Sequence, residues 1–267
     1  FIGDVRDFDR LKFATKSVDF VIHAAALKHV PIAEYNPFEV VKTNVLGAQN
    51  VIDACVYNNV KKVIALSTDK ASSPVNLYGA SKLTSDKLFI AANNFVGKDL
   101  RFSVVRYGNV MGSNGSVIPI FMKMKDKGFF EITDKRMTRF NITLEESVNF
   151  VLLSLSKMLG GEIYVPKIPS YNITDVAKAI DTKSKIKIIG IRPGEKIHEE
   201  MISKNESINS LEFDKYFVIL PDTKFGKINK KIYLKKFKNA KLCKPGFQYN
   251  SKENKKFLKI KKLQKLI

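Results

Sequence analysis

The sequence predicts a doubly wound α/β fold, in which helices cover both faces of a mainly parallel sheet. Apolar runs of strand length end in small or polar residues, and longer segments of helical pattern separate them. Strands that alternate with helices form a parallel sheet with right-handed crossovers. The chain has 267 residues, of which 45% are hydrophobic, so it can bury a substantial core.

The first elements follow this pattern. Residues 1–7 read as the end of a strand and its loop, so we expect the chain to begin in the middle of a fold. Residues 18–26 form an apolar run that closes in small residues, as a buried parallel strand does. Asn36 and Pro37 then predict a helix to about residue 57, with asparagine as N-cap and proline in the first turn.

Two further strands are predicted at residues 62–67 and 102–107, with a helix from about 78 to 95 between them. Reactive groups of such folds lie at the carboxyl ends of the parallel strands. In this sequence those ends are residues 23–25, 67–69 and 108–110.

The pattern loosens after the third strand. Residues 112–116 are rich in glycine and serine and predict a substrate loop within residues 109–142. A helix over 144–158 follows, capped by Thr143. We therefore expect a partial Rossmann-like domain over 1–158 that lacks its N-terminal strands. A smaller C-terminal substrate-binding α/β domain, ending in a lysine-rich tail, should span 159–267.

The net charge of +20 is concentrated in that tail. Residues 223–267 hold sixteen lysines and one acid, Glu253, which accounts for +15 of the total. Such a segment can bind nucleic acid or an anionic membrane, attract an anionic nucleotide substrate, or form a solvated surface. It has no arginine and no glycine-aromatic recognition motif, so we favour the solvated surface and expect no nucleic-acid partner.

Other classes are disfavoured by what the composition lacks. Only Cys55 and Cys243 occur, without the spacing of a disulfide framework or a metal site, so no metal is expected. No apolar run is long enough to span a bilayer, and no secretory leader pattern opens the chain. We expect a cytoplasmic protein that does not bind membranes.

The most informative residues lie around the second strand end. Tyr78 and Lys82 are four residues apart and share one helical face, so a cationic Lys82 could lower the pKa of Tyr78 until it accepts a proton. Asp69 and Lys70 add a second acid/base pair just before them. The tyrosine and lysine spacing alone is a weak pattern, and its position after a strand ending in Ser-Thr-Asp strengthens it.

At these residues the chain resembles the extended short-chain dehydrogenase/reductase superfamily. Within it, the sequence is similar to the inverting UDP-N-acetylglucosamine 4,6-dehydratases that begin pseudaminic acid synthesis for flagellin glycosylation. The strings that carry the resemblance are His-Ala-Ala-Ala-Leu-Lys-His-Val-Pro at 23–31, Ser-Thr-Asp-Lys-Ala at 67–71, Asn-Leu-Tyr-Gly-Ala-Ser-Lys at 76–82, Arg-Tyr-Gly-Asn-Val at 106–110 and Arg-Pro-Gly-Glu-Lys at 192–196.

This resemblance implies an intramolecular redox cycle on UDP-N-acetylglucosamine with NADP. Tyr78 would take the O4 proton while hydride leaves C4, and Lys82 would hold the cofactor ribose. Lys70 would then remove the C5 hydrogen, helped to lose its own proton by nearby cations. Asp69 would protonate the departing C6 hydroxyl, after which hydride returns to C6 with inversion at C5. Thr68 would bond O4 or, alternatively, only cap the strand end.

The resemblance also implies binding residues. For NADP they are Asp4, Val5, Ala24, Tyr78, Lys82 and Val110. For the substrate they are Lys28, Asn109, Arg139, Arg192 and Glu195. The two arginines match the diphosphate. His23, His29 and His198 are expected to be structural, and family members form homo-oligomers.

Alternatives remain open on the sequence. A C5-retaining dehydratase, or a dehydratase with epimerase activity for capsule or O-antigen sugars, would share the same four catalytic residues. A non-enzymatic nucleotide or nucleic-acid binding fragment is the second class. The family begins with a glycine-rich strand-turn-helix that holds the cofactor pyrophosphate, and none precedes Phe1. We expect roughly sixty family residues to precede this chain, and the chain alone to bind the dinucleotide poorly and to be inactive.

Overall fold

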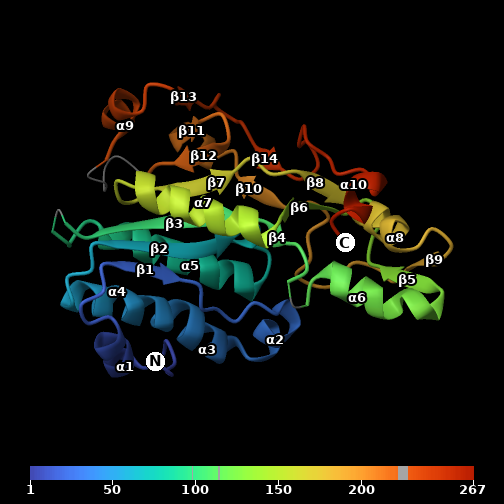
Figure 1. Cartoon of the computed structure of the whole chain (residues 1–267), viewed down its shortest axis with the longest axis horizontal. Helices are drawn as coiled ribbons and strands as arrows, with labels where there is room; N and C mark the ends of the chain where they lie inside the picture. The colour runs from blue at the N-terminus through green and yellow to red at the C-terminus, as the bar shows by residue number, and fades with distance from the viewer. Residues whose placement is uncertain (98, 114, 222–227) are drawn as a thin grey trace.

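The computed structural model describes residues 1–97, 99–113, 115–221 and 228–267, and a seven-stranded sheet forms its centre (Figure 1). The strand order is β1-β2-β3-β7-β12-β11-β13. The first four strands are parallel: β1 (Phe20–His23), β2 (Lys62–Thr68), β3 (Arg101–Tyr107) and β7 (Ile163–Pro166). The last three are antiparallel: β12 (Tyr216–Ile219), β11 (Ser210–Glu212) and β13 (Lys241–Leu242). The predicted α/β fold class is confirmed.

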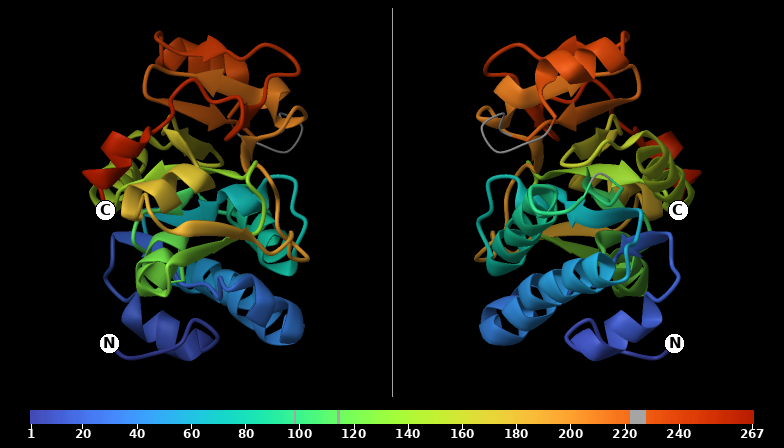
Figure 2. Two further views of the ribbon diagram at one scale, coloured as in Figure 1. Left: turned by 90° about the vertical axis from the view of Figure 1, so that its right-hand side faces the viewer. Right: turned by 90° about the vertical axis from the view of Figure 1, so that its left-hand side faces the viewer.

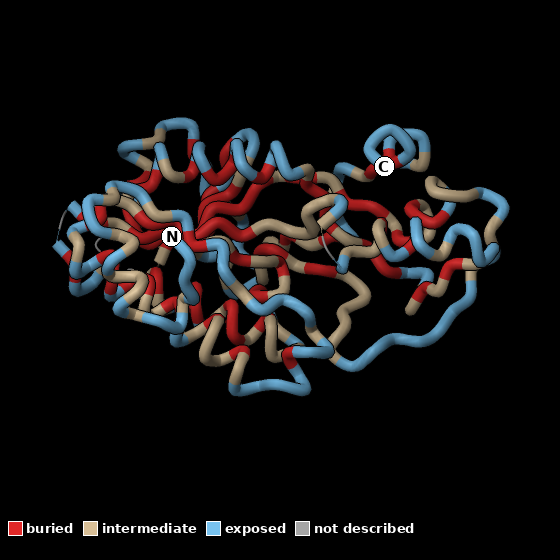
Figure 3. The backbone as a smooth tube through the Cα atoms, turned by 60° about the horizontal axis from the view of Figure 1, so that its bottom comes forward, coloured by how far each residue is buried: buried red, intermediate tan, exposed pale blue. Residues whose placement is uncertain are grey.

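Helices cover both faces of this sheet (Figures 1 and 2). On one face lie α4 (Gly47–Tyr57) and α5 (Leu77–Ala92), with α1 (Phe8–Ala14) against α4. On the other lies α7 (Leu144–Lys157). Neighbouring residues of β3 enter different cores: Val104 packs with Phe89 on the α5 face, and Val105 packs with Phe150 on the α7 face. This alternation follows from the pleat of a strand, and buried residues gather along the sheet (Figure 3).

A second lobe lies beside the carboxyl ends of the strands (Figure 1). It holds a core of its own that includes Phe121, Phe130 and Leu263. Its elements are α6 (Val117–Met124), β5 (Phe129–Ile132), α8 (Ile173–Ile180), β9 (Lys185–Ile188) and α10 (Ile260–Gln264). Between this lobe and the large sheet lie β4 (Asn109–Val110), β6 (Thr138–Ile142), β8 (Ser170–Asn172), β10 (Glu200–Ile202) and β14 (Tyr249–Asn250). Helix α9 (Lys230–Lys236) packs through Tyr233 into the core that lies between the sheet and α7.

The large sheet continues across the boundary predicted at residues 158 and 159. Strand β7 comes after that boundary and pairs with β3, which comes before it. The second lobe likewise combines α6 from before the boundary with α8 from after it. The division into 1–158 and 159–267 therefore stays a prediction, and the two spatial lobes do not follow it.

The N-termini of three helices show which predicted capping residues form capping hydrogen bonds. Thr143 caps α7, and the Glu146 carboxylate accepts from the Thr143 backbone N–H, which completes a capping box. Asn76 caps α5 by accepting from the Gly79 N–H at 2.8 Å. Asn36 stands at the predicted N-cap position of the helix that begins at Pro37, but its side chain makes no capping hydrogen bond. A short helix, α2 (Val30–Tyr35), precedes Asn36, whose amide donates back to the Ile32 carbonyl instead.

The predicted helix to residue 57 is present but irregular. It consists of α3 (Pro37–Val40), a π-helical segment (Val41–Leu46) and α4. Within the described ranges, no helix combines the length and apolarity needed to cross a bilayer. Two predicted features lie partly outside the described residues: Asn114 of the expected substrate loop, and 223–227 at the start of the lysine-rich tail.

Candidate active site

A pocket of about 540 Å³ opens where β2 and β3 end and the second lobe begins. Its walls come from the strand ends, the start of α5, the loop after β4, and residues 192–199. The sequence-predicted residues that line it are Ala24, Lys28, Thr68, Lys70, Tyr78, Lys82, Asn109, Val110, Arg139, Arg192 and Glu195. The fold thus brings together residues that are scattered along the chain, at the sheet edge where they were expected.

Tyr78 and Lys82 lie one turn apart on α5, and both reach the pocket. The expected lowering of the Tyr78 pKa by Lys82 is not what the structure gives. Burial raises the pKa of Tyr78, and the groups that oppose burial are the Lys70 ammonium and a hydrogen bond with Thr68. Burial also lowers the pKa of Lys82, against the opposing charge of Asp86. Lys82 is 3% exposed, so this amine has little water to stabilise its charge.

Asp69 and Lys70 form a short 3₁₀ turn directly after β2. The Thr68 hydroxyl donates to Asp69 Oδ1 at 3.1 Å, and the Lys70 backbone N–H donates to the same hydroxyl oxygen at 3.3 Å. The turn packs against the start of α5 at Gly79, where a Cβ would collide with the Lys70 carbonyl. Glycine in the Tyr-Gly-Ala-Ser-Lys string therefore lets the two acid/base pairs approach each other.

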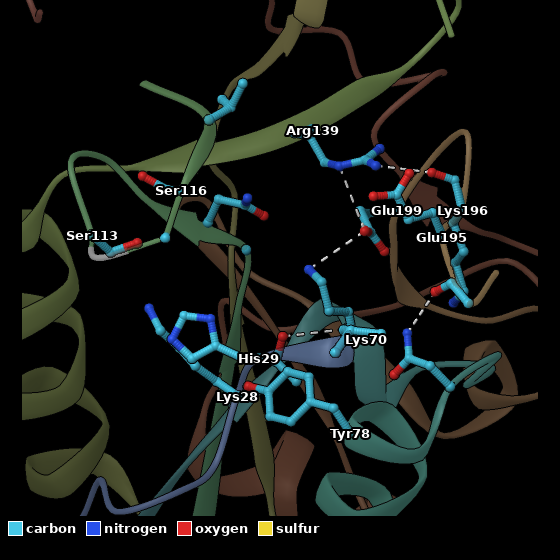
Figure 4. Close-up of a pocket in the computed structure, with 18 of the residues that line it drawn as sticks. Lys28, His29, Lys70, Tyr78, Ser113, Ser116, Arg139, Glu195, Lys196 and Glu199 are labelled. Atoms are coloured by element: carbon cyan, nitrogen blue, oxygen red, sulfur yellow. Dashed lines mark hydrogen bonds and ion pairs between the residues drawn. The ribbon is translucent and has the colours of Figure 1, made fainter. Parts of the chain in front are cut away.

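Lys70 lies between two carboxylates, and the cation Arg139 also acts on it. Its Nζ lies 3.0 Å from Asp69 Oδ1. It also lies 3.4 Å from Glu199 Oε1 (Figure 4). Burial alone would lower the pKa of Lys70, but the two carboxylates outweigh it and raise the pKa above its ordinary value. Arg139 lowers the pKa of Lys70, as expected of a neighbouring cation, but it does not offset the carboxylates, so the expected net lowering is wrong.

Asp69 is fully buried and lies next to Lys70, which lines the pocket. Burial raises its pKa, the Lys70 ammonium lowers it, and the Glu199 charge raises it again. Its Oδ2 has no hydrogen-bond partner in the described part of the chain. Asp69 can therefore carry a proton under conditions in which a solvent-exposed aspartate would not.

Arg139 lines the pocket, but its guanidinium is already engaged. It donates to the carbonyls of Thr138 and Ile197. It also donates to the Lys196 carbonyl, and its Nε lies 3.7 Å from Glu199 Oε1 (Figure 4). These contacts hold residues 196–199 against β6. A role of Arg139 in diphosphate binding stays a prediction, and the arrangement does not favour it.

Arg192 and Lys28 are better placed for an anionic ligand. Both side chains are exposed at the pocket, and neither forms an ion pair with any residue that the structure describes. Glu195 also lines the pocket. All three assignments stay predictions.

Asp4 and Val5, assigned to the cofactor by resemblance, do not line the pocket. Asp4 is exposed and pairs with Arg6 at 2.8 Å, and the hydrogen bond from Arg6 lowers the pKa of Asp4 to about 2. The Val5 side chain lies against α4 beside Gly47, and its carbonyl accepts from Asn50. Their cofactor roles stay predictions.

Several polar atoms of the pocket are buried without a partner among the described residues. Protein interiors rarely leave such groups unpaired, so each indicates a place where a ligand group or water bonds. These atoms are Asn109 Oδ1, Ser116 Oγ, Glu195 Oε2 and Glu199 Oε2.

The sequence interpretation missed three charged groups. Glu199 is 3% exposed and meets Lys70. Lys196, which the motif includes without a role, donates from Nζ to the Ser72 carbonyl at 2.7 Å. Asp86, one turn after Lys82 on α5, is 1% exposed and faces Arg106 at 3.6 Å. The one available signal was the four-residue spacing of Asp86 from Lys82, since charged residues four apart on a helix are neighbours.

His29 is a further lining residue, although we expected a structural role for it. Its ring lies so close to Gly115 that a Cβ there would come within 2.7 Å of it. Gly115 has a φ of +74°, a conformation that favours glycine. The histidine therefore shapes the loop that follows β4.

Comparison with known proteins gives a consistent result. A family model described as "Polysaccharide biosynthesis protein" matches residues 1–221. The chain is 56% identical to a protein named UDP-N-acetylglucosamine 4,6-dehydratase (inverting) from Campylobacter jejuni, over all of this chain and 81% of that protein.

Solved structures with the same fold as this chain are also found. The protein Pen from Bacillus thuringiensis has a TM-score of 0.88 and 38% identity, with coverage of 100% of this chain and 81% of that one. A dTDP-glucose 4,6-dehydratase from Streptomyces venezuelae, solved with NAD bound, has a TM-score of 0.65 and 24% identity, with coverage of 73% and 68%. The second similarity concerns the fold alone.

Proposed function

The chain belongs to the polysaccharide biosynthesis protein family, and from this membership and the pocket we propose that it acts as an NADP-dependent UDP-N-acetylglucosamine 4,6-dehydratase that inverts C5. The 56% identity to a dehydratase of that name supports the reaction. The observation that carries the proposal is that Tyr78, Lys82 and Lys70 line one pocket, with the buried Asp69 bonded to Lys70. Tyr78 and Lys82 suit an alcohol oxidation, and Asp69 and Lys70 suit an elimination that a simple dehydrogenase does not perform.

The first pair would handle the O4 hydroxyl. Thr68 lies at the end of β2 beside Tyr78, where it can orient O4 while Tyr78 takes its proton. The residues present fit a nicotinamide dinucleotide: Ala24 leaves room at the end of β1, and Lys82 offers an amine in the same wall. When bound, the dinucleotide supplies hydride acceptance from C4 and hydride return to C6.

The second pair would carry out the loss of water. A keto group at C4 acidifies the C5 hydrogen, which Lys70 removes in its neutral form. Asp69, whose pKa burial raises, takes up a proton from Lys70 and gives it to the C6 hydroxyl, which leaves as water. Transfer of the ammonium proton of Lys70 to Asp69 across their 3.0 Å hydrogen bond gives the neutral base and the protonated acid at the same time.

The rest of the pocket would hold the nucleotide sugar. Asn109 Oδ1 is buried and unpartnered in the described structure, so it can accept a hydrogen bond from a sugar hydroxyl or amide. Lys28 and Arg192 provide positive charge for the diphosphate, and Glu195 can accept from ribose hydroxyls.

The test is product analysis by NMR after incubation of the full-length protein with UDP-N-acetylglucosamine in deuterated water. We expect a 4-keto-6-deoxy sugar with deuterium at C5 and inverted configuration. Retained configuration would identify the C5-retaining or epimerase alternative, and unchanged substrate would refute the dehydratase. Parallel assays with NADP and NAD would decide the cofactor, which we propose to be NADP.

Three finer roles belong to the same proposal. The product would enter pseudaminic acid synthesis for flagellin glycosylation, the protein would form homo-oligomers, and it would act in the cytoplasm. Mass measurement in solution by light scattering tests the oligomer. Salt-sensitive DNA binding without affinity for UDP-sugars would instead favour a non-enzymatic binding protein.

A further inference from the structure

Glu199 is a buried carboxylate that no sequence motif assigned and that the reaction outlined above does not use. It immediately precedes β10, is 3% exposed and lines the pocket. Its backbone N–H donates to the Ser251 hydroxyl at 2.9 Å, and its carbonyl accepts from the Ser251 N–H at 2.8 Å. The Ser251 hydroxyl in turn bonds Thr138 on β6, so the main chain of Glu199 is fixed.

Among the described residues, the charged groups that surround the Glu199 carboxylate are Lys70, Arg139 and Lys196. Oε1 lies 3.4 Å from Lys70 Nζ and 3.7 Å from Arg139 Nε. Lys196 approaches from the same loop, and Asp69 and Tyr171 lie within electrostatic reach. Glu199 Oε2 is buried and has no hydrogen-bond partner among the residues that the structure describes. Burying a carboxylate in this way costs free energy, which a functional role would explain.

We propose that Glu199 is a positioning residue that holds Lys70 and sets the pH range in which the Asp69–Lys70 pair carries a single proton. This inference rests on the proposed dehydratase, because that reaction needs neutral Lys70 and protonated Asp69 at the same moment.

The electrostatics of the three groups supports this role. Burial alone would raise the pKa of Glu199, but Lys70, Arg139 and Lys196 outweigh burial and lower it, so Glu199 remains ionised. Its negative charge raises the pKa of both Asp69 and Lys70. The pair titrates as a unit, and it holds one proton between its two macroscopic pKa values. Loss of the Glu199 charge lowers both values, so the active range moves to lower pH.

The direct test is Glu199→Gln, which keeps the shape and removes the charge. We expect both limbs of the pH profile of kcat/KM to move to lower pH by about one unit. Because Lys70 Nζ also loses a charged partner at 3.4 Å that holds it in place, kcat should fall about tenfold, with KM within about threefold of wild type. The matched control is Glu200→Gln, because Glu200 binds Ser73 and Gln248 and does not face Lys70; its profile should not move.

A second measurement does not depend on turnover. In protein labelled with ¹³C-lysine, the Lys70 signal, assigned through Lys70→Arg, should titrate at lower pH in Glu199→Gln, while the Lys82 signal should keep its midpoint. Glu199→Asp, which withdraws the carboxylate by one methylene, should give an intermediate midpoint. It carries the test if the glutamine variant does not fold.

An unmoved profile and an unmoved Lys70 midpoint, with activity merely reduced, would overturn the proposal and leave Glu199 a structural role. If wild-type protein does not convert UDP-N-acetylglucosamine, the dehydratase proposal fails, and the Lys70 titration still decides whether Glu199 controls this lysine.

Discussion

Two lysines reach the same pocket in opposite electrostatic states. Lys70 follows β2 and lies between the carboxylates of Asp69 and Glu199, which raise its pKa. Lys82 lies on α5, where burial lowers its pKa and only the charge of Asp86 opposes burial among the described groups. Lys70 is half-buried, whereas Lys82 is buried. The nearby carboxylates, more than burial, separate the directions in which the two pKa values shift.

This difference assigns the lysines to different steps. A buried amine with little competition from carboxylates is available to ligand groups such as ribose hydroxyls. An amine that shares a proton with Asp69 is suited to proton transfer. This assignment can be tested by replacing either lysine and measuring the first hydride transfer and the elimination of water separately.

Lys82→Met should have the largest effect. It removes the amine beside Tyr78, so we expect the first hydride transfer and overall turnover to fall together by about 10³-fold. Rapid-mixing absorbance of the reduced nicotinamide, with product quantified by NMR, measures both. Full formation of reduced nicotinamide in this variant would contradict the assignment.

Lys70→Met should separate the two halves. We expect water elimination to fall about 10²-fold, while the first hydride transfer stays within about tenfold of wild type because Tyr78 and Lys82 are intact. The same two measurements apply. Equal loss of both steps would show that the two lysines act together, and normal turnover would eliminate Lys70 as the C5 base.

Asp86→Asn tests how much the charge near Lys82 and Arg106 contributes to the free energy of unfolding. Asp86 lies 3.6 Å from Arg106, whose side chain is fully buried, so removing one charge leaves buried cations less compensated. We expect a loss of about 3 kcal/mol in the free energy of unfolding, measured by urea denaturation. Asp53→Asn is the matched control, because exposed Asp53 accepts only from Gln49 within the described contacts.

The smallest effects should come from the neighbouring hydroxyls. Ser67 donates to Asp86 at 2.7 Å, and Thr68 donates to Asp69 at 3.1 Å. Ser67→Ala should cost about 1 kcal/mol of stability and change turnover little, since its partner is structural. Thr68→Val should instead reduce turnover more than stability. A reversal of these two results would show that the Asp86 cluster, not the Asp69 cluster, limits the reaction.

Local patterns predicted much of the fold. The strands at 62–67 and 102–107 and the helix after Thr143 were recognisable because their apolar periodicity and capping residues are local. Asn36 takes the predicted N-cap position without a capping bond, because a helix that the capping signal does not reveal ends just before it and accepts from its amide. The lobes could not be predicted, because β7 joins β3 through pairing that no local pattern encodes.

For the site, the sequence alone determined the two acid/base pairs, because Asp69 adjoins Lys70 and Tyr78 lies one helical turn from Lys82. Only the tertiary structure decided the charge state of each lysine. Glu199 reaches Lys70 because β10 and β6 are brought together beside the end of β2, and the strength of that charge depends on distance and burial. Residue types and spacing fix which groups are present, whereas their pKa values depend on the charges that folding places around them.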